Sequence, residues 1–264
     1  MRFCNIASGS SGNCTYVGDE DTHLIIDAGI SGKRIEAGLN DLDLSASDVA
    51  GVLITHEHTD HIGGLGVLAR RFDLPIYATA GTIDAIQGMP RFQNIPDHLF
   101  NTVHADEEFT IGDIHVLPVG ISHDAAEPVA YRFEAGGKRA SIATDLGIYD
   151  EHLVECMKDS NILMLEANHD VRMLEAGPYP YTLKRRILSE IGHLSNDLCG
   201  RLLCELISDR LDQVILGHLS QDNNLEELAY ETVRLEVTMS DDHIWGGFPV
   251  CIARRNERTE CYEV

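Results

Sequence analysis

The stretch Thr55-His56-Glu57-His58-Thr59-Asp60-His61 says more about fold and chemistry than any other part of the chain. It follows the apolar run Gly51–Thr55 and precedes the turn at Gly63-Gly64, after which a helical pattern begins. In extended backbone, successive side chains point to opposite sides. His56 and His58 therefore point to the same side and can share one metal ion.

A second ion can lie beside the first. Asp60 and His61 fall where the chain turns from the strand into the helix, so their side chains can face a neighbouring ion. Neutral imidazole and carboxylate ligands suit zinc, manganese or iron. The short stretch thus predicts a metal centre of up to two divalent ions, whose identity the residue types leave open.

The rest of the chain alternates apolar runs with helical patterns, which predicts one layered α/β domain over residues 1–264. The glycine pair 136–137 predicts a hairpin turn. Strands are expected at Thr22–Asp27, Gly51–Thr55, Pro75–Ala78, Glu108–Ile111, Ile114–Val119, Ala130–Glu134, Arg139–Thr144, Asn161–Glu166 and Asp212–Leu216. Helices are expected at Gly64–Arg71, Asp150–Met157, Thr182–Ile191, Asn196–Ile207 and Asn224–Glu236.

Composition narrows the class of protein. The 264 residues include 43 acidic and 20 basic ones, for a formal charge of -23, which opposes binding of nucleic acid or an anionic membrane over the whole surface. We find no secretory signal and no apolar stretch of about 20 residues, so we expect no membrane contact and a cytoplasmic location. The seven cysteines show no C-x-x-C pair, which indicates reduced thiols.

The H-x-H-x-D-H pattern of residues 56–61 resembles that of the metallo-β-lactamase superfamily. The resemblance implies a four-layer αββα sandwich, in which two mixed β-sheets are flanked by helices and strand ends converge on a two-metal site. About seventy residues separate Asp145 from His218, too few for the large inserted cap domain of RNA-processing relatives. The resemblance also assigns the site residues. The first ion is expected on His56, His58 and His123, the second on Asp60, His61 and His218, with Asp145 bridging both ions and Asp27 orienting the histidine loop.

This arrangement predicts a hydrolase. Two ions about 3.5–4 Å apart can hold a bridging water, lower its pKa and so supply a hydroxide nucleophile. They also neutralise charge that develops on a phosphoryl or carbonyl oxygen. Asp60 can both bind an ion and accept a proton from the attacking water, which makes it the candidate catalytic residue.

A loop of small residues near the N-terminus, Ala7–Cys14, resembles the opening of the YycJ/WalJ-like branch of the superfamily, whose characterised members are 5′-to-3′ exonucleases on duplex DNA. Backbone N–H groups and hydroxyls in such a loop can cradle an anion. Further similarity to this branch extends over most of the chain. The candidate substrate-binding residues are Ser8, Ser10, Ser11, Asn13, His169, Arg185, His193 and Ser195.

The favoured hypothesis is a binuclear phosphodiesterase, most concretely a 5′-3′ DNA exonuclease. A hydrolase of a small phosphodiester, thioester or lactone is the first alternative, because the acidic body opposes a long polyanion. A metal-binding module without enzymatic activity is the second. The basic cluster Lys184–Arg186 bears on this choice, since it favours DNA only if it lies at the mouth of the site. Monomer and homodimer both stay open.

Overall fold

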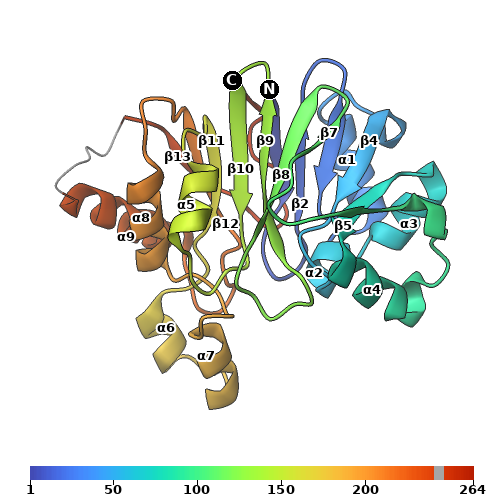
Figure 1. Cartoon of the computed structure of the whole chain (residues 1–264). Coiled ribbons are helices and arrows are strands. Elements are labelled where there is room, and N and C mark those ends of the chain that lie inside the picture. The colour runs from blue at the N-terminus through green and yellow to red at the C-terminus, as the bar shows by residue number, and fades with distance from the viewer. Residues whose placement is uncertain (241–246) are drawn as a thin grey trace.

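The computed structural model describes residues 1–240 and 247–264. Two seven-stranded mixed sheets pack face to face, and helices cover the outer face of each sheet, as Figure 1 shows. The four-layer αββα architecture predicted from the sequence is confirmed. No helix in the described part of the chain is long and apolar enough to cross a bilayer.

The first sheet contains most of the N-terminal half of the chain. Its strand order is β14-β1-β2-β3-β4-β5-β6, and β3 to β6 run parallel to one another. The bounds are Arg2–Ala7 (β1), Cys14–Gly18 (β2), His23–Ile26 (β3), Val49–Leu53 (β4), Ile76–Thr79 (β5), Phe100–Val103 (β6) and Tyr262–Glu263 (β14).

The second sheet has the order β13-β12-β11-β10-β9-β8-β7. Strands β7 to β10 form an antiparallel meander, and β10 to β13 are parallel. The bounds are Phe109–Ile111 (β7), Ile114–Gly120 (β8), Val129–Ala135 (β9), Lys138–Ala143 (β10), Ile162–Glu166 (β11), Gln213–Gly217 (β12) and Val250–Ile252 (β13).

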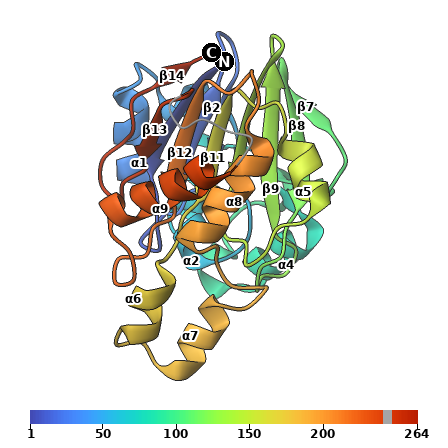
Figure 2. The ribbon, with the colours of Figure 1, turned by 90° about the vertical axis from the view of Figure 1, so that its left-hand side faces the viewer.

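The helices divide between the two outer faces. Helices α1, α3 and α4 cover the first sheet, and α5, α8 and α9 cover the second (Figure 1). Two short helices, α6 and α7, project beyond the body, which Figure 2 shows from the side. The bounds are Gly32–Asn40 (α1), Thr59–Ile62 (α2), Leu65–Phe72 (α3), Ala80–Gly88 (α4), Glu151–Met157 (α5), Val171–Ala176 (α6), Tyr181–Ile187 (α7), Asn196–Leu206 (α8) and Glu226–Met239 (α9).

Buried apolar side chains form three core layers. One lies between the sheets and includes Phe3, Tyr131 and Phe133, all fully buried. The other two lie between each sheet and its covering helices. Fully burying one large apolar side chain contributes about 1.5–3 kcal/mol, so these layers supply the free energy that holds the polar strand ends in place.

Each predicted strand and helix corresponds to an observed element, and one predicted helix ends earlier than expected. Gly136 and Gly137 form the hairpin turn between β9 and β10, with φ of 58° and 74°. The helix expected at Thr182–Ile191 was wrong beyond Ile187, because the chain turns back there and the His193 N–H donates to the Ile187 carbonyl over 3.0 Å. A Cβ at Gly192 would lie 2.1 Å from that same oxygen, so the turn favours glycine.

Candidate metal centre

A buried carboxylate at the end of β3 positions the histidine loop. Asp27 has a left-handed φ of 60°, and its N–H donates to the carbonyl of Leu53 on β4 over 2.8 Å. Its side chain accepts from the Thr55 N–H at 2.9 Å and lies 2.7 Å from His61 Nδ1. Asp27 therefore fixes both ends of the loop, as expected for a residue that orients ligands from behind.

The loop lies tightly against the neighbouring backbone. The carbonyl of Asp60 accepts from the Asn13 N–H over 2.7 Å, and the carbonyl of His61 accepts from the Ala28 N–H over the same distance. A Cβ at Gly29 would lie only 1.6 Å from the Asp60 carbonyl oxygen. This close approach requires glycine, so Asp60 and His61 are held by backbone contacts that tolerate no side chain at residue 29.

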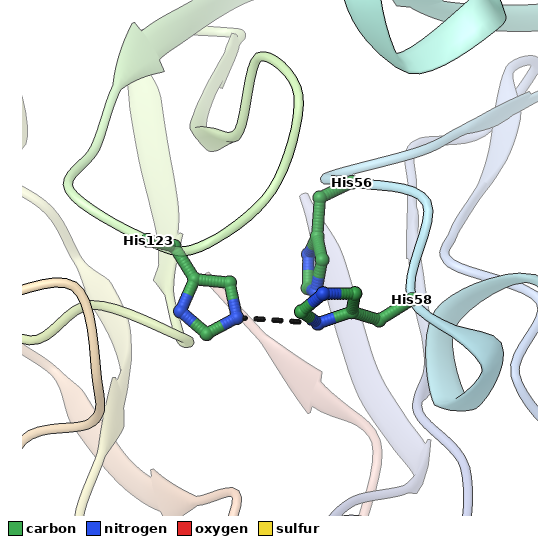
Figure 3. A group of neighbouring side chains, drawn as sticks. All are labelled: His56, His58 and His123. Carbon is green, nitrogen blue, oxygen red and sulfur yellow. Dashed lines mark hydrogen bonds between the residues drawn. The ribbon is translucent and has the colours of Figure 1, made fainter. Parts of the chain in front are cut away.

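His56, His58 and His123 form the first group of candidate ligands (Figure 3). Their ligand nitrogens all lie within 4.8 Å of one another, and His58 Nδ1 lies 3.3 Å from His123 Nε2. His123 comes from the loop after β8, on the other sheet, and its Nδ1 lies 3.1 Å from the Gly192 carbonyl oxygen. Burial and then the neighbouring imidazoles lower the pKa of His56, which favours the neutral form that binds metal.

Asp60, His61 and His218 form the second group. Asp60 Oδ2 lies 3.6 Å from Nε2 of both histidines. Asp145 lies between the two groups, because it clusters with His56 and His61 and its Oδ2 is 3.3 Å from His61 Nε2. Asp145 follows β10 and His218 follows β12, and both have left-handed φ values, of 62° and 54°.

The donor atoms of this cluster fit divalent ions. His56 Nε2, Asp145 Oδ2 and His218 Nε2 are buried and have no hydrogen-bond partner within residues 1–240 and 247–264. A buried polar atom left without a partner costs about 1–3 kcal/mol, and metal coordination would satisfy all three atoms. The two groups and Asp145 between them make up all seven of the expected ligands.

Glu166, at the end of β11, is the site residue that sequence reasoning missed. Its Oε1 accepts from His218 Nδ1 at 2.7 Å and from His193 Nδ1 at 2.9 Å. Its Oε2 accepts from the N–H groups of Leu146 at 3.1 Å and Leu194 at 3.0 Å. The available signal was its place as the final, acidic residue of the apolar run Asn161–Glu166, in the same position relative to its strand as Asp27.

Charge pairing governs the ionisation of these buried groups. Burial favours a neutral Glu166, but His193 and then His218 outweigh it, and the pKa of the carboxyl falls well below its usual range. Burial likewise works to lower the pKa of His61, yet Asp27 and then Asp145 raise it to about 9. Without metal, the centre therefore holds protons on histidines that a bound ion would displace.

The small-residue loop lies against the centre. Ser8 is buried, and its Oγ accepts from the His218 N–H at 2.7 Å. Asn13 Oδ1 accepts from the Gly9 N–H at 2.7 Å, and its Nδ2 lies 3.0 Å from His61 Nε2. Ser8 and Asn13 thus contact candidate ligands, whereas Ser10 and Ser11 are exposed at the tip of the loop, and substrate binding by these four residues stays a prediction.

The remaining predicted substrate-binding residues lie on the second sheet's side. His193 borders the centre, with its Nδ1 3.7 Å from Asp145 Oδ1. His169 and Ser195 are buried and form an isolated β-bridge with each other. Neither ring nitrogen of His169 has a hydrogen-bond partner among the residues that the structure describes. Arg185 is exposed on α7. Substrate contact by any of these residues stays a prediction.

Comparison with known proteins gives the family. A sequence model described as "Beta-lactamase superfamily domain" matches residues 22–218, a range that contains all seven expected ligands. Exodeoxyribonuclease YycJ of Bacillus anthracis is 42% identical to the chain, and the match covers 88% of each chain. The chain belongs to the YycJ/WalJ branch of the metallo-β-lactamase superfamily.

A second relative agrees with this placement, and a solved structure agrees with the fold. Exodeoxyribonuclease WalJ of Streptococcus pneumoniae is 36% identical, over 91% of this chain and 90% of its own length. Among solved structures, the metallo-β-lactamase fold protein YhfI of Bacillus subtilis superposes with a TM-score of 0.72 and 18% identity, covering 98% of this chain and all of that one. The family and the His/Asp cluster make this YycJ/WalJ-like chain a metal-dependent hydrolase.

Proposed function

We propose that the chain is a DNA exonuclease that uses two divalent ions and digests from the 5′ end. The observation that most directly supports this proposal is the pair of adjoining candidate ligand groups that meet at Asp145. Separations of 3.3–3.6 Å between the donor atoms of His61, Asp60 and Asp145 match those of ligands sharing one ion. Relatives named exodeoxyribonucleases support DNA as the substrate.

We assign the first ion to His56, His58 and His123, and the second to Asp60, His61 and His218. Asp145 is the shared ligand. When bound, two ions of zinc, manganese or iron supply Lewis acidity, which lowers the pKa of a water and neutralises charge on a phosphate. Asp27 and Glu166 orient the histidine ligands from behind.

The chain's own residues move the protons. Asp60 is the most exposed of the acidic ligands, with 24% of its side chain accessible, so it can accept a proton from the attacking water. His193 is 18% accessible, and its Nδ1 is hydrogen-bonded to Glu166. Burial works to lower the pKa of His193, but Glu166 outweighs it and raises that pKa, so the ring can carry a second proton on Nε2 and donate it to the departing oxygen. Both residues reach the solvent edge, where substrate must arrive.

The substrate contacts and the domain organisation belong to the same proposal. Ser10 and Ser11 are candidates for contact with a terminal phosphate, because both are exposed beside the ligand-positioning residues of their loop. His169 and Ser195 are candidates for deeper contacts. We treat residues 1–264 as one domain, because an apolar core joins the two sheets and ligands come from both.

A linear duplex DNA with one radiolabelled 5′-phosphate tests the proposal. We expect manganese-dependent release of the labelled nucleotide before the length of the strand changes. Intact DNA, together with turnover of a thioester or of a small phosphodiester such as bis(p-nitrophenyl) phosphate, would favour the small-substrate alternative that the charge of -23 supports. Zinc binding without turnover of any ester would favour a metal-binding module.

A further inference from the structure

Residues 171–191, which include helices α6 and α7, form an arm that projects from the body (Figures 1 and 2). The arm is tied together internally, because Lys184 Nζ donates to the carbonyls of Glu175 and Gly177, each over 2.7 Å. Its shape is therefore fixed by hydrogen bonds between its two helices, and its surface can be considered as one unit.

Both ends of the arm are anchored to loops that carry metal ligands. At the first end, the Asp170 N–H donates to the Asn223 carbonyl over 2.9 Å, in the loop that follows His218, and Tyr179, between the two helices, donates to Asp222 Oδ2 in the same loop over 2.8 Å. At the second end, the Ile191 carbonyl accepts from the Asp124 N–H at 3.2 Å, directly after His123. Arg186 also forms an ion pair with Asp124. The arm is thus attached beside the candidate metal centre.

The charge of the arm opposes that of the body. Residues 171–191 contain four basic and two acidic side chains, whereas the whole chain has 20 basic and 43 acidic ones. Arg172 and Arg185 are exposed. Within residues 1–240 and 247–264, neither has an acidic side chain at ion-pair distance, while Arg186 is occupied by Asp124. The arm therefore presents two cations at the edge of a centre that an acidic body surrounds.

One face of α7 combines an exposed aromatic ring with an exposed arginine, as surfaces that bind nucleic acid do. Tyr181 and Arg185 are four residues apart and so lie on the same side of the helix, and Leu188 continues that side. Tyr181 is 75% exposed and Leu188 is 45% exposed, although both are large and apolar enough to favour burial. An exposed aromatic ring can stack on an unpaired base, and arginine binds phosphate bidentately.

We infer that the α6–α7 arm binds the DNA strand that enters the metal centre, with Arg172 and Arg185 on backbone phosphates and Tyr181 stacked on an unpaired base. This inference rests on the proposed function and adds where the substrate is held and in which form. The acidic body repels the rest of the DNA, so the arm holds the strand by its end, where bases that separate from the duplex can reach Tyr181.

Fluorescence anisotropy with a labelled 12-nucleotide single strand, in calcium, measures binding without relying on turnover. We expect Arg185→Gln to weaken binding about ten-fold and to reduce the slope of log K against log salt by about 0.7, the value for one lost phosphate contact. Tyr181→Ala should weaken binding about ten-fold with the slope unchanged, because stacking releases no counterions. Arg70→Gln on α3 is the matched control, since Arg70 is exposed and α3 lies on the other side of the body in Figure 1.

The outcomes separate the two proposals. If Arg185→Gln and Arg70→Gln bind the strand equally well, with equal salt slopes, the arm is not the binding surface even though wild-type protein digests DNA. A blunt duplex bound as tightly as the single strand by wild type, and unaffected by Tyr181→Ala, would overturn the assignment of an unpaired strand. Digestion of no DNA by wild type would instead refute the proposed function. Metal content and the thermal unfolding midpoint of each variant verify that the fold is intact.

Discussion

Replacing Glu166 by glutamine removes a charge from the most densely hydrogen-bonded carboxylate of the centre. Each oxygen of Glu166 accepts two hydrogen bonds, from His193 and His218 on one side and from two backbone N–H groups on the other. A glutamine has one acceptor oxygen, so in either orientation two of the four donors face an NH₂ group. At about 1–3 kcal/mol for each unsatisfied donor, the metal-free variant should lose about 2–6 kcal/mol of unfolding free energy.

The Glu166→Gln substitution should also weaken metal binding. His218 depends on Glu166 for the orientation and protonation of its ring, and loss of such a supporting partner lowers metal affinity or activity about 10–100-fold. Urea unfolding of the metal-free protein and titration with manganese measure the two effects. Glu134→Gln is the control, because the Glu134 carboxylate accepts from Arg139 Nε at 2.7 Å but is partly exposed, and an exposed pair contributes below about 1 kcal/mol. Equal stability and equal metal affinity in the two variants would refute the role given to Glu166.

Three further changes have defined outcomes. His58→Ala should lose nearly all DNA turnover while far-ultraviolet circular dichroism stays unchanged, and full activity would remove His58 from the ligand set. Gly29→Ala should lower the unfolding midpoint and the metal content together, because its Cβ would lie 1.6 Å from the Asp60 carbonyl oxygen; unchanged values would contradict the close approach. Metal binding at pH 7.5 should release protons, since the metal-free pKa of His61 is about 9 and a protonated ring cannot coordinate, and affinity should rise as pH increases toward 9. Calorimetry in buffers of different ionisation enthalpy measures that release, and a heat independent of buffer would contradict it.

The sequence predicted those parts of the fold whose local pattern is strong. Apolar runs such as Asn161–Glu166 and Asp212–Leu216 are buried parallel strands, and such strands are recognisable as continuous hydrophobic segments. The short edge strand Tyr262–Glu263 and the helix Ala80–Gly88 were not predicted. The strand has only two residues, and the helix contains two glycines, which lower helix propensity. Both depend on packing against distant segments, which no local pattern records.

The candidate ligands were predictable because the pattern of residues 56–61, together with Asp27, His123, Asp145 and His218, falls at the ends of apolar runs in the order that the superfamily resemblance implies. Glu166 ends the predicted strand Asn161–Glu166 but received no role, since its partners His193 and His218 are 27 and 52 residues away. The basic cluster Lys184–Arg186 also divides in a way the sequence does not show. Lys184 supports the arm, Arg186 pairs with Asp124, and only Arg185 stays exposed without an ion-pair partner among the described residues.

The proposed ligands come from both sheets, so an ion bound by them would also be a reversible cross-link between the two halves of the molecule. An ion held by His56 and His123 closes a loop of about 67 residues, and one held by His61 and His218 closes a loop of about 157 residues. Each tenfold excess of free ion over its dissociation constant adds about 1.4 kcal/mol to the folded state. If the proposed ligands hold metal, the concentration of available ion would affect how firmly the two sheets are joined, as well as whether the hydrolase is active.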